Sequence, residues 1–288
     1  MQVNKIYHKD CLELMSEIAS KSIDCIITSP PYWQLRDYGY QEQWGLEPTF
    51  QEYLEHLWQF MGFAHRILKD TGTMWINLGD TYSAGGRSSA NKLGGKQKTI
   101  KGMESLSKLG YRHPPPGMSE KCLLLIPHRF AIGCVDRGWI LRNTIVWAKR
   151  NCMPEGVIDR FSRKHEYVFL FTKQRDYYFD LNSVKSGKNP GDVSDLWDIT
   201  VKPSREGHCA AYNPNLIDKP ILAGCQEGGI ILDSFCGTGT TCARAIQLGR
   251  NTIGCDGNEK FCEIAENKIK TELEKGWLIP EVKGLPVK

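Results

Sequence analysis

Several arrangements of metal- and redox-active residues are missing from this sequence. Its 288 residues include eleven cysteines but no Cys-x-x-Cys pair, and its seven histidines show no metal-ligand spacing. A zinc knuckle or a thioredoxin-like redox site is therefore excluded, and we expect no bound metal. Cys25, Cys134, Cys225 and Cys255 stand in apolar stretches, which is typical of buried free thiols in a reducing, intracellular compartment.

Long hydrophobic runs and a strong excess of charge are also missing. No apolar run approaches the ~18 residues of a membrane helix, and residues 1–10 lack the pattern of a signal peptide, so we expect a cytoplasmic protein without a membrane partner. The formal charge of +4 permits a nucleic-acid partner without requiring one. Residues 87–112 hold five lysines against one glutamate, which fits either a solvated loop or a phosphate-contacting element.

Hydrophobic periodicity predicts strands that alternate with helices. This order indicates an α/β fold with a doubly wound, mostly parallel sheet of the Rossmann-like type. Two segments show no clear period, a basic insertion at 79–118 and a polar stretch at 180–208. A catalytic domain would then comprise residues 1–78 and 119–288. The expected strands are 22–28, 73–78, 139–147, 166–172, 229–233 and 251–255, and the expected helices are 50–68, 126–136, 213–225, 240–248 and 259–275, with Asp70-Thr71-Gly72 ending the first helix.

A glycine turn in residues 230–241 (IILDSFCGTGTT) is the first candidate ligand site. Gly237 and Gly239 allow the backbone to approach a ligand closely, and the free amides of a helix beginning near Thr240 favour an anionic group. Position 242 is cysteine, so the third glycine of the dinucleotide fingerprint is missing. That argues against NAD or FAD but not against S-adenosylmethionine, which carries a carboxylate and no pyrophosphate.

Two further residues near the glycine turn suit a nucleotide-like ligand. Asp256 ends the next expected strand, where an acidic side chain can bind ribose hydroxyls, although a plain strand-end aspartate is the simpler interpretation. Phe235 can contact a sulfonium as an aromatic ring contacts any cation, or it can belong to the core.

The segment Thr28-Ser29-Pro30-Pro31-Tyr32-Trp33 follows the first expected strand and is the second candidate site. A proline pair is often an ordinary turn, but here it can aim a backbone carbonyl rigidly. The exocyclic amine of a base is a poor nucleophile because its lone pair is delocalised into the ring. Two acceptors, the Ser29 hydroxyl and the Pro30 carbonyl, would hold its hydrogens, and Tyr32 would stack on the base, which is worth ~1–3 kcal/mol. Trp33 would be a pocket wall or a core residue.

The two segments TSPPYW and LDSFCGTGTT together resemble motif IV and motif I of the DNA amino-methyltransferases. Their order along the chain is similar to that of the permuted beta group, and the resemblance covers nearly the whole chain, including residues 139–151 and 160–170. It implies a class I methyltransferase fold with inserted target-recognition segments, S-adenosylmethionine as the cofactor and double-stranded DNA as the substrate. It also implies that residues 213–224 contact the methionine end of the cofactor. The cofactor residues implied in this way, together with those of the glycine turn, are Asp10, Cys11, Asp233, Phe235, Gly237, Gly239, Thr240 and Asp256.

The sequence departs from that family at two places. Many relatives have a bulky residue after the acidic residue that corresponds to Asp256, whereas this chain has Gly257, which would loosen the adenine pocket. The 79–118 insertion contains no family motif.

The residues of the Thr28–Trp33 segment narrow the choice of target base. The chain has no Pro-Cys dipeptide, which makes cytosine C5 chemistry improbable. Serine can accept or donate a hydrogen bond, while an ionised aspartate only accepts. In the family, a serine at the position of Ser29 favours N4 of cytosine, and an aspartate there favours N6 of adenine. We therefore predict a cytosine-N4 DNA methyltransferase. The alternatives are adenine N6, an RNA or protein-glutamine substrate, or a DNA-binding protein without turnover.

Recognition of DNA is expected to involve basic residues between 180 and 208 together with the insertion. Side chains there can contact phosphates, which would associate the protein with the nucleoid. A restriction endonuclease partner and a homodimer are both compatible with the chain. The candidate contacts are Lys185, Lys188, Lys202 and Arg205.

Overall fold

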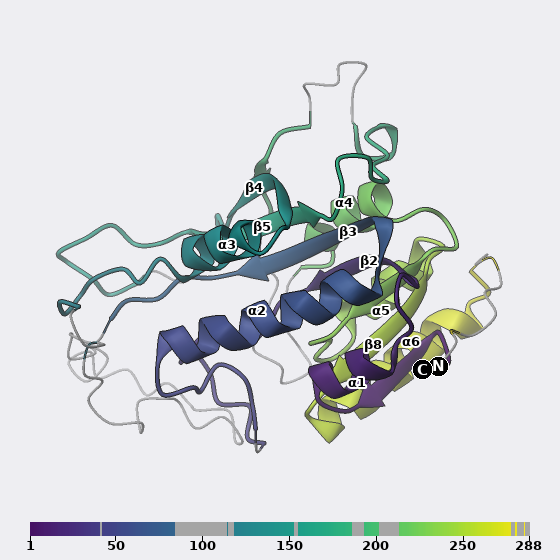
Figure 1. The fold of residues 1–288 in the computed structure, drawn as a ribbon, viewed down its shortest axis with the longest axis horizontal. Helices are drawn as coiled ribbons and strands as arrows, with labels where there is room; N and C mark the ends of the chain where they lie inside the picture. The colour runs from purple at the N-terminus through teal and green to yellow at the C-terminus, as the bar shows by residue number, and fades with distance from the viewer. Residues whose placement is uncertain are drawn as a thin grey trace.

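The computed structural model describes residues 1–40, 42–83, 114, 118–152, 155–185, 193–201, 213–277, 280 and 285. These residues form one eight-stranded sheet covered by helices on both faces (Figure 1). The elements are β1 (Lys5–His8), α1 (Cys11–Glu17), β2 (Ile23–Thr28), α2 (Phe50–Ile67), β3 (Leu68–Leu78), α3 (Ile126–Asp136), β4 (Ile140–Ala148), β5 (His165–Thr172), η3 (Asn182–Val184), β6 (Leu196–Asp198), α4 (Asn215–Gly224), β7 (Ile230–Asp233), α5 (Thr240–Gln247), β8 (Asn251–Asp256) and α6 (Glu259–Glu274).

The sheet has the strand order β1-β8-β7-β2-β3-β5-β4-β6. Within it β5 pairs antiparallel with both β3 and β4, and the remaining neighbours pair parallel. The prediction of a doubly wound, mostly parallel α/β sheet is therefore confirmed. Strands β1, β8, β7, β2 and β3 all end at the same edge, which we call the carboxyl edge. In open sheets of this kind ligands bind at that edge.

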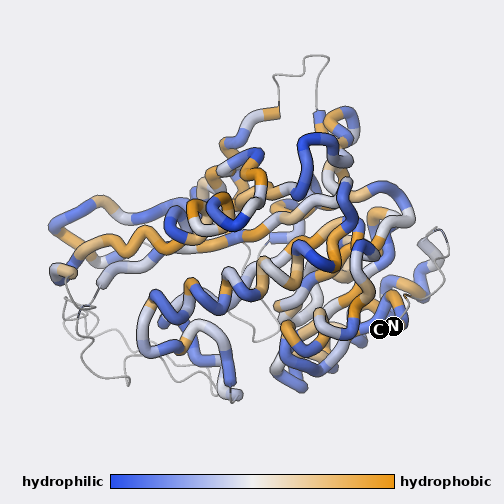
Figure 2. Tube along the Cα trace, in the orientation of Figure 1, coloured by the Kyte–Doolittle hydropathy of each residue, from blue (hydrophilic) through white to orange (hydrophobic). Residues whose placement is uncertain are grey.

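Three hydrophobic clusters hold the helices to the sheet. Successive residues of a strand point to opposite faces, so Ile26 packs with α1, α2 and α3, whereas Cys25 and Ile27 pack with α4. A third cluster joins α5 and α6 to β1. The central strands are accordingly coloured mostly as hydrophobic in Figure 2. The four cysteines that the sequence placed in apolar stretches are all buried and free.

The predicted break between α2 and β3 is wrong. We expected Asp70-Thr71-Gly72 to separate a helix from a strand, but β3 begins at Leu68, directly after α2. Gly72 suits a strand here because a Cβ atom at this position would come within 2.8 Å of the Asp24 carbonyl oxygen of the neighbouring strand. Asp70 is held by ion pairs with Lys21 and Lys173. Periodicity also did not reveal β1, α1 or β6, which are short.

No helix in the described part of the chain is long and apolar enough to cross a membrane.

Candidate active site

The Pro-Pro turn follows β2 at the carboxyl edge and is held from the side of α2. The Tyr53 hydroxyl of α2 donates a hydrogen bond of 2.8 Å to the Pro31 carbonyl oxygen. Gly45 lies against the same turn, and a Cβ atom there would come within 2.9 Å of the Tyr32 carbonyl oxygen. The turn is thus fixed by its neighbours as well as by its two prolines.

Tyr32 is the best-anchored side chain of this turn. Its hydroxyl lies 2.9 Å from Oδ1 of Asn77 and 2.8 Å from Oε2 of Glu166. The Asn77 amide nitrogen donates to the Tyr167 carbonyl oxygen, which leaves its oxygen facing Tyr32. Gly79 lets the ring approach, because a Cβ atom there would be 2.6 Å from the ring.

Glu166 connects Tyr32 to a further charged residue. Lys149, at the end of β4, forms an ion pair with Glu166, and both side chains are largely buried. Burial raises the pKa of the Tyr32 hydroxyl, and the negative charge of Glu166 adds to that increase. A hydrogen bond from Ser29 acts on this pKa in the opposite direction, which places Ser29 beside the Tyr32 hydroxyl. Sequence reasoning found Ser29 and Tyr32 but not the anchoring pair of Glu166 and Lys149.

The Pro-Pro turn and the glycine turn are joined by one buried hydrogen bond. The Thr28 hydroxyl, at the end of β2, donates to Oδ1 of Asp233 at the end of the neighbouring strand β7, over 2.7 Å. Asp233 also accepts from the Phe235 backbone amide and from the Thr241 side chain. Burial raises the pKa of Asp233 to about 6 despite these bonds. Asp233 was predicted as a cofactor residue, and the structure shows that it links the two turns.

The glycine turn presents features that suit a small anionic ligand. Gly237 and Gly239 have positive φ angles of 51° and 75°, and a Cβ atom at Gly239 would be 2.8 Å from that of Ala265 in α6. In the described part of the chain no side chain caps the N-terminus of α5, so a backbone amide such as that of Thr240 can face a ligand there. The Thr238 hydroxyl is buried and finds no hydrogen-bond partner among the described residues. An unpaired buried hydroxyl next to an uncapped helix N-terminus fits a bound polar group such as an amino-acid carboxylate.

Asp256 lies against the glycine turn from the end of β8. It accepts a hydrogen bond of 2.9 Å from the Gly237 amide and another of 2.9 Å from the Asn258 amide. Burial raises the pKa of Asp256, and these two bonds partly offset that shift. A carboxylate can accept further hydrogen bonds from ribose hydroxyls while it holds the turn.

Asp10 and Cys11 lie at the carboxyl edge, where Asp10 caps a helix and Cys11 packs in the core. Asp10 caps α1, accepting hydrogen bonds from the amides of Leu12 and Glu13. Cys11 is buried among core residues. The negative charges of Asp256 and Asp10 both raise the pKa of the Tyr40 hydroxyl, after the larger effect of its burial, so the three side chains lie near one another.

Tyr40 fills the space that Gly257 leaves open, and no motif in the sequence indicated it. A Cβ atom at Gly257 would be 2.5 Å from the Tyr40 ring. The segment before it is fastened to α6, because the side-chain nitrogen of Asn258 donates to the Tyr38 carbonyl oxygen over 3.2 Å. The loop after the Pro-Pro turn therefore reaches across to the glycine-turn side of the site. The only signal in the sequence was the glycine where relatives have a bulky residue.

Two aromatic candidates contact the core. Trp33 is buried, and its indole nitrogen donates to the Glu47 carbonyl oxygen over 3.0 Å. Phe235 packs against Trp44 and Phe60, with ring centroids 5.2 and 5.6 Å away. Trp33 is thus a core residue, whereas Phe235 is only partly buried beside the core, and its contact with a sulfonium stays a prediction.

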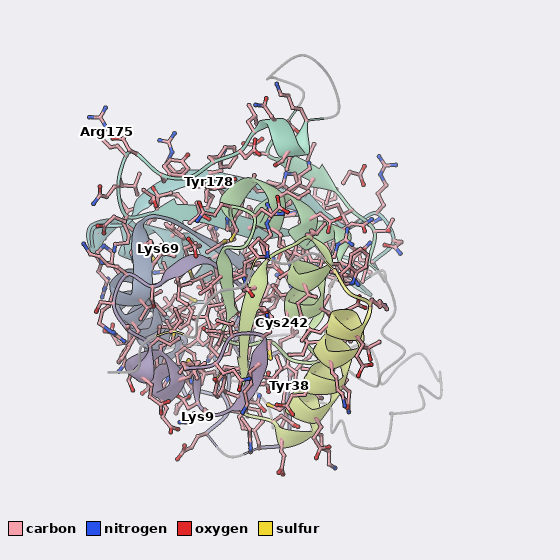
Figure 3. The ribbon with its side chains drawn as sticks, turned by 90° about the vertical axis from the view of Figure 1, so that its right-hand side faces the viewer. Lys9, Tyr38, Lys69, Arg175, Tyr178 and Cys242 are labelled. Atoms are coloured by element: carbon pink, nitrogen blue, oxygen red, sulfur yellow. The ribbon has the colours of Figure 1, made fainter. Side chains whose placement is uncertain are left out.

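The predicted DNA contacts are only partly visible. Lys188, Lys202 and Arg205 lie outside the described residues. Lys185 follows η3 in a segment fastened at the edge opposite to the Pro-Pro turn, where the Tyr178 amide donates to the Thr71 carbonyl oxygen and the Asp180 amide to that of Ala223. Figure 3 views the molecule from that side and shows Tyr178 and Lys69 there. The structure does not bring Lys185 to the Pro-Pro turn.

The 79–118 insertion lies almost wholly outside the described residues, but its two ends meet at the carboxyl edge. The Ser83 hydroxyl donates to the Ser119 carbonyl oxygen over 2.7 Å and accepts from the Cys122 amide over 2.9 Å.

Comparison with known proteins gives a consistent result. A DNA methylase family model, of the N6/N4 type, matches residues 23–267. The Type II methyltransferase M.Cfr9I of Citrobacter freundii is 37% identical over 93% of this chain and 88% of its own length. M.SmaI of Serratia marcescens, another Type II methyltransferase, is 37% identical over 92% of this chain and 90% of its own length.

Solved structures share the fold at much lower identity. The PvuII DNA methyltransferase, described as cytosine-N4-specific, has a TM-score of 0.68 and 17% identity, and covers 94% of this chain and 91% of its own. A DNA modification methylase from Thermus thermophilus, complexed with S-adenosyl-L-methionine, has a TM-score of 0.61 and 19% identity, and covers 93% and 95%.

Proposed function

The chain belongs to the N6/N4 DNA methylase family, and from this premise we propose that it transfers a methyl group from S-adenosylmethionine to N4 of a flipped cytosine in DNA. The hydrogen bond between Thr28 and Asp233 carries the proposal, because it holds the two functional turns on adjacent strands. A donor bound at the glycine turn and a base bound at the Pro-Pro turn would thereby meet at the carboxyl edge. Bringing two reactants together in this way supplies much of the rate of a direct transfer.

The glycine-turn side of the site would hold the cofactor. S-adenosylmethionine would supply a methyl group activated by its sulfonium. The uncapped N-terminus of α5 and the Thr238 hydroxyl suit the carboxylate of its amino-acid end. Asp256 would accept from the ribose hydroxyls, and Asp10 and Tyr40 would bound the adenine.

The Pro-Pro turn would hold the base. The Ser29 hydroxyl and the Pro30 carbonyl accept hydrogen bonds from the amine and bias its nitrogen toward a tetrahedral geometry. Tyr32 stacks on the base, and Glu166 and Asn77 fix its ring through the hydroxyl. The base reaches this pocket only after it leaves the duplex.

The preference for cytosine N4 rests on Ser29, and one structural relative supports it. Serine at this position can adapt its hydrogen bond to the ring nitrogen of cytosine, whereas an ionised aspartate can only accept. The structural relative described as cytosine-N4-specific supports the same assignment. Adenine N6 is the alternative that the experiment must separate.

The relatives named as Type II methyltransferases support a role in restriction-modification, with a restriction endonuclease as the partner. We propose that residues 1–78 and 119–288 form the catalytic domain and that the 79–118 insertion contacts DNA. Of residues 180–208, we propose the part after β6 as a DNA contact, because β6 runs toward the carboxyl edge whereas Lys185 lies at the opposite edge. The hydrogen bond between Ser83 and Ser119 joins the two ends of the insertion, which supports an insertion that projects from the catalytic domain. A homodimer is compatible with this arrangement.

The test is mass spectrometry of nucleosides from DNA incubated with the protein and isotopically labelled S-adenosylmethionine. Labelled N4-methylcytosine is the expected product. Labelled N6-methyladenine would keep the reaction class and refute the assignment of Ser29 to cytosine. No labelled nucleoside from varied DNA, including genomic DNA, would refute the proposal and favour an RNA or protein substrate or a silent binding protein.

A further inference from the structure

The loop between β4 and β5, residues 149–164, carries two apolar side chains in full contact with water. Ile158 is 102% exposed and Phe161 is 97% exposed, more than any other large hydrophobic residue described. Single exposed apolar residues are common on proteins. Two fully exposed apolar side chains three positions apart on one loop are unusual. Burying each would be worth ~1.5–3 kcal/mol, so the pair indicates a surface that a partner covers.

Two arginines of this loop turn inward, whereas its two apolar side chains point outward together with Arg150, Asp159 and Lys164. Arg160 pairs with Glu155 at 2.5 Å and lies over the Tyr82 ring at 4.0 Å. Arg163 donates to the Asp80 carbonyl oxygen and lies 5.2 Å from the same ring. The loop is therefore held against residues 80–82 by Arg160 and Arg163, while Ile158 and Phe161 face water.

The bracing places the loop beside the base pocket. Its two ends are the paired residues Ala148 and His165, at the carboxyl edge of the sheet. The residues next to these ends, Lys149 and Glu166, are the pair that anchors the Tyr32 hydroxyl. Asp80, which receives Arg163, directly follows the Gly79 that lies against the Tyr32 ring.

We propose that the β4–β5 loop is a wedge that enters the DNA duplex beside the target base, with Phe161 and Ile158 inserted where the flipped base was stacked. The inference rests on the proposed function, because only an enzyme that extrudes a base needs to fill the gap it leaves. Apolar side chains act in this way in other DNA-bending proteins, where they separate neighbouring base pairs.

The charge of the loop favours DNA over another partner. Residues 149–164 contain five basic and two acidic side chains. Lys149, Arg160 and Arg163 are held in ion pairs with Glu166 or Glu155, so the basic side chains that stay exposed for phosphates are Arg150 and Lys164. A second copy of the chain bound to Ile158 and Phe161 would cover the carboxyl edge and compete with the substrate. Duplex DNA is the partner that can contact the loop and the base pocket at once.

The experiment compares the unmodified protein with the double variant Ile158→Ala/Phe161→Ala on two oligonucleotides. Both contain a target site mapped beforehand with the unmodified protein. In one the target base is paired normally, and in the other it faces an abasic site and leaves the stack easily. Leu273→Ala is the control, because Leu273 is an exposed apolar residue of α6, away from this loop.

The double variant should methylate the paired duplex about tenfold more slowly, a loss of about 1.4 kcal/mol. It should methylate the unpaired target at nearly the normal rate and bind S-adenosylmethionine normally. A 2-aminopurine at the target position should also show less fluorescence increase with the variant. The control should match the unmodified protein in each measurement.

Three results would overturn the wedge. Equal losses on both oligonucleotides would mean that the loop supports the pocket rather than base extrusion, and normal rates on both would remove it from DNA binding. A dimer of the unmodified protein that the double variant cannot form, seen by light scattering, would assign the pair to a second copy. Failure of the proposed function is distinguishable, because then the unmodified protein would methylate neither oligonucleotide.

Discussion

The hydroxyl of Thr28 and the carboxylate of Asp233 are 205 residues apart in sequence and 2.7 Å apart in space. Thr28 ends β2, directly before Ser29 and the proline pair. Asp233 ends β7, shortly before Gly237 and Gly239. Both side chains are buried, so the bond is shielded from competing water. Because a bond between two strand ends constrains both turns that follow, we expect it to affect stability and turnover together.

Thr28→Val tests this bond with almost no change in shape. The variant leaves Asp233 buried with one donor fewer, which should lower the free energy of unfolding by ~1–3 kcal/mol. Urea unfolding of Thr28→Val, Asp233→Ala and the double variant would measure the coupling between the two residues, because each single variant removes the bond. Additive effects in that cycle would show that the bond contributes nothing.

Thr252→Val is the matched control for this substitution. Thr252 is also fully buried in the sheet, but its hydroxyl has no hydrogen-bond partner in the part of the chain that the structure describes. Removing an unsatisfied hydroxyl should leave stability unchanged or raise it. A loss as large as that of Thr28→Val would point to packing rather than to the hydrogen bond.

The raised pKa of Asp233 predicts a pH-dependent stability. Burial lifts this pKa from 3.8 to about 6, so the folded protein binds the proton more tightly than the unfolded chain does. The resulting stabilisation is complete below pH 3.8 and is lost as the pH rises to about 6, a change on the order of 3 kcal/mol.

The comparison with Asp233→Asn isolates this contribution from other carboxyls such as Asp256, whose pKa is also raised. Asparagine still offers an oxygen to Thr28 and to the Phe235 amide. The difference in unfolding free energy between the protein and the variant should shift in favour of the variant between pH 4 and pH 7. A constant difference across that range would mean that Asp233 titrates normally.

The sequence was enough to predict the fold class and the two turns, because both depend on local patterns. The alternation of strands and helices follows from periodicity, and TSPPYW and LDSFCGTGTT are contiguous motifs. The error at residues 70–72 arose because a glycine in a tightly packed strand has the same local pattern as a glycine in a turn.

The contacts between distant segments could not be predicted from those patterns. Glu166 meets Tyr32 from 134 residues away, and only the register of β5 against β3 brings them together. Tyr40 belongs to a loop without periodicity, so its place over Gly257 depends on how that loop folds back. Residues of this kind become visible only when the sheet is assembled.

The anchoring of Tyr32 predicts different outcomes for two substitutions. Tyr32→Ala removes the ring and should cost most of the transfer rate, since stacking is worth ~1–3 kcal/mol and positioning is lost as well. Tyr32→Phe keeps the ring and loses the bonds to Asn77 and Glu166, so its rate should fall less. Single-turnover rates on the mapped target would measure both, with calorimetry to verify unchanged cofactor affinity. Equal losses in the two variants would show that the hydroxyl, not the ring, is the essential part.

Tyr40 gives the sharpest test of the cofactor side of the site. If its ring bounds the adenine where Gly257 leaves room, Tyr40→Ala should weaken binding of S-adenosylmethionine by ~1–3 kcal/mol, the range for losing an aromatic stack on a base. Tyr40→Phe should bind normally, because the ring and not the hydroxyl forms the wall. Tyr178→Ala is the control, since Tyr178 lies at the opposite edge of the sheet (Figure 3).

Isothermal calorimetry with the full chain would give these dissociation constants directly. Tighter binding by Tyr40→Ala would refute the wall, because it would mean that the ring occupies the place of the adenine and must move before the cofactor enters. Gly257→Val separates the two possibilities further. A side chain there would displace the Tyr40 ring, which lies 2.5 Å from the position of the added Cβ atom. The valine variant should therefore lose affinity if the ring is a wall and gain affinity if the ring is an obstruction.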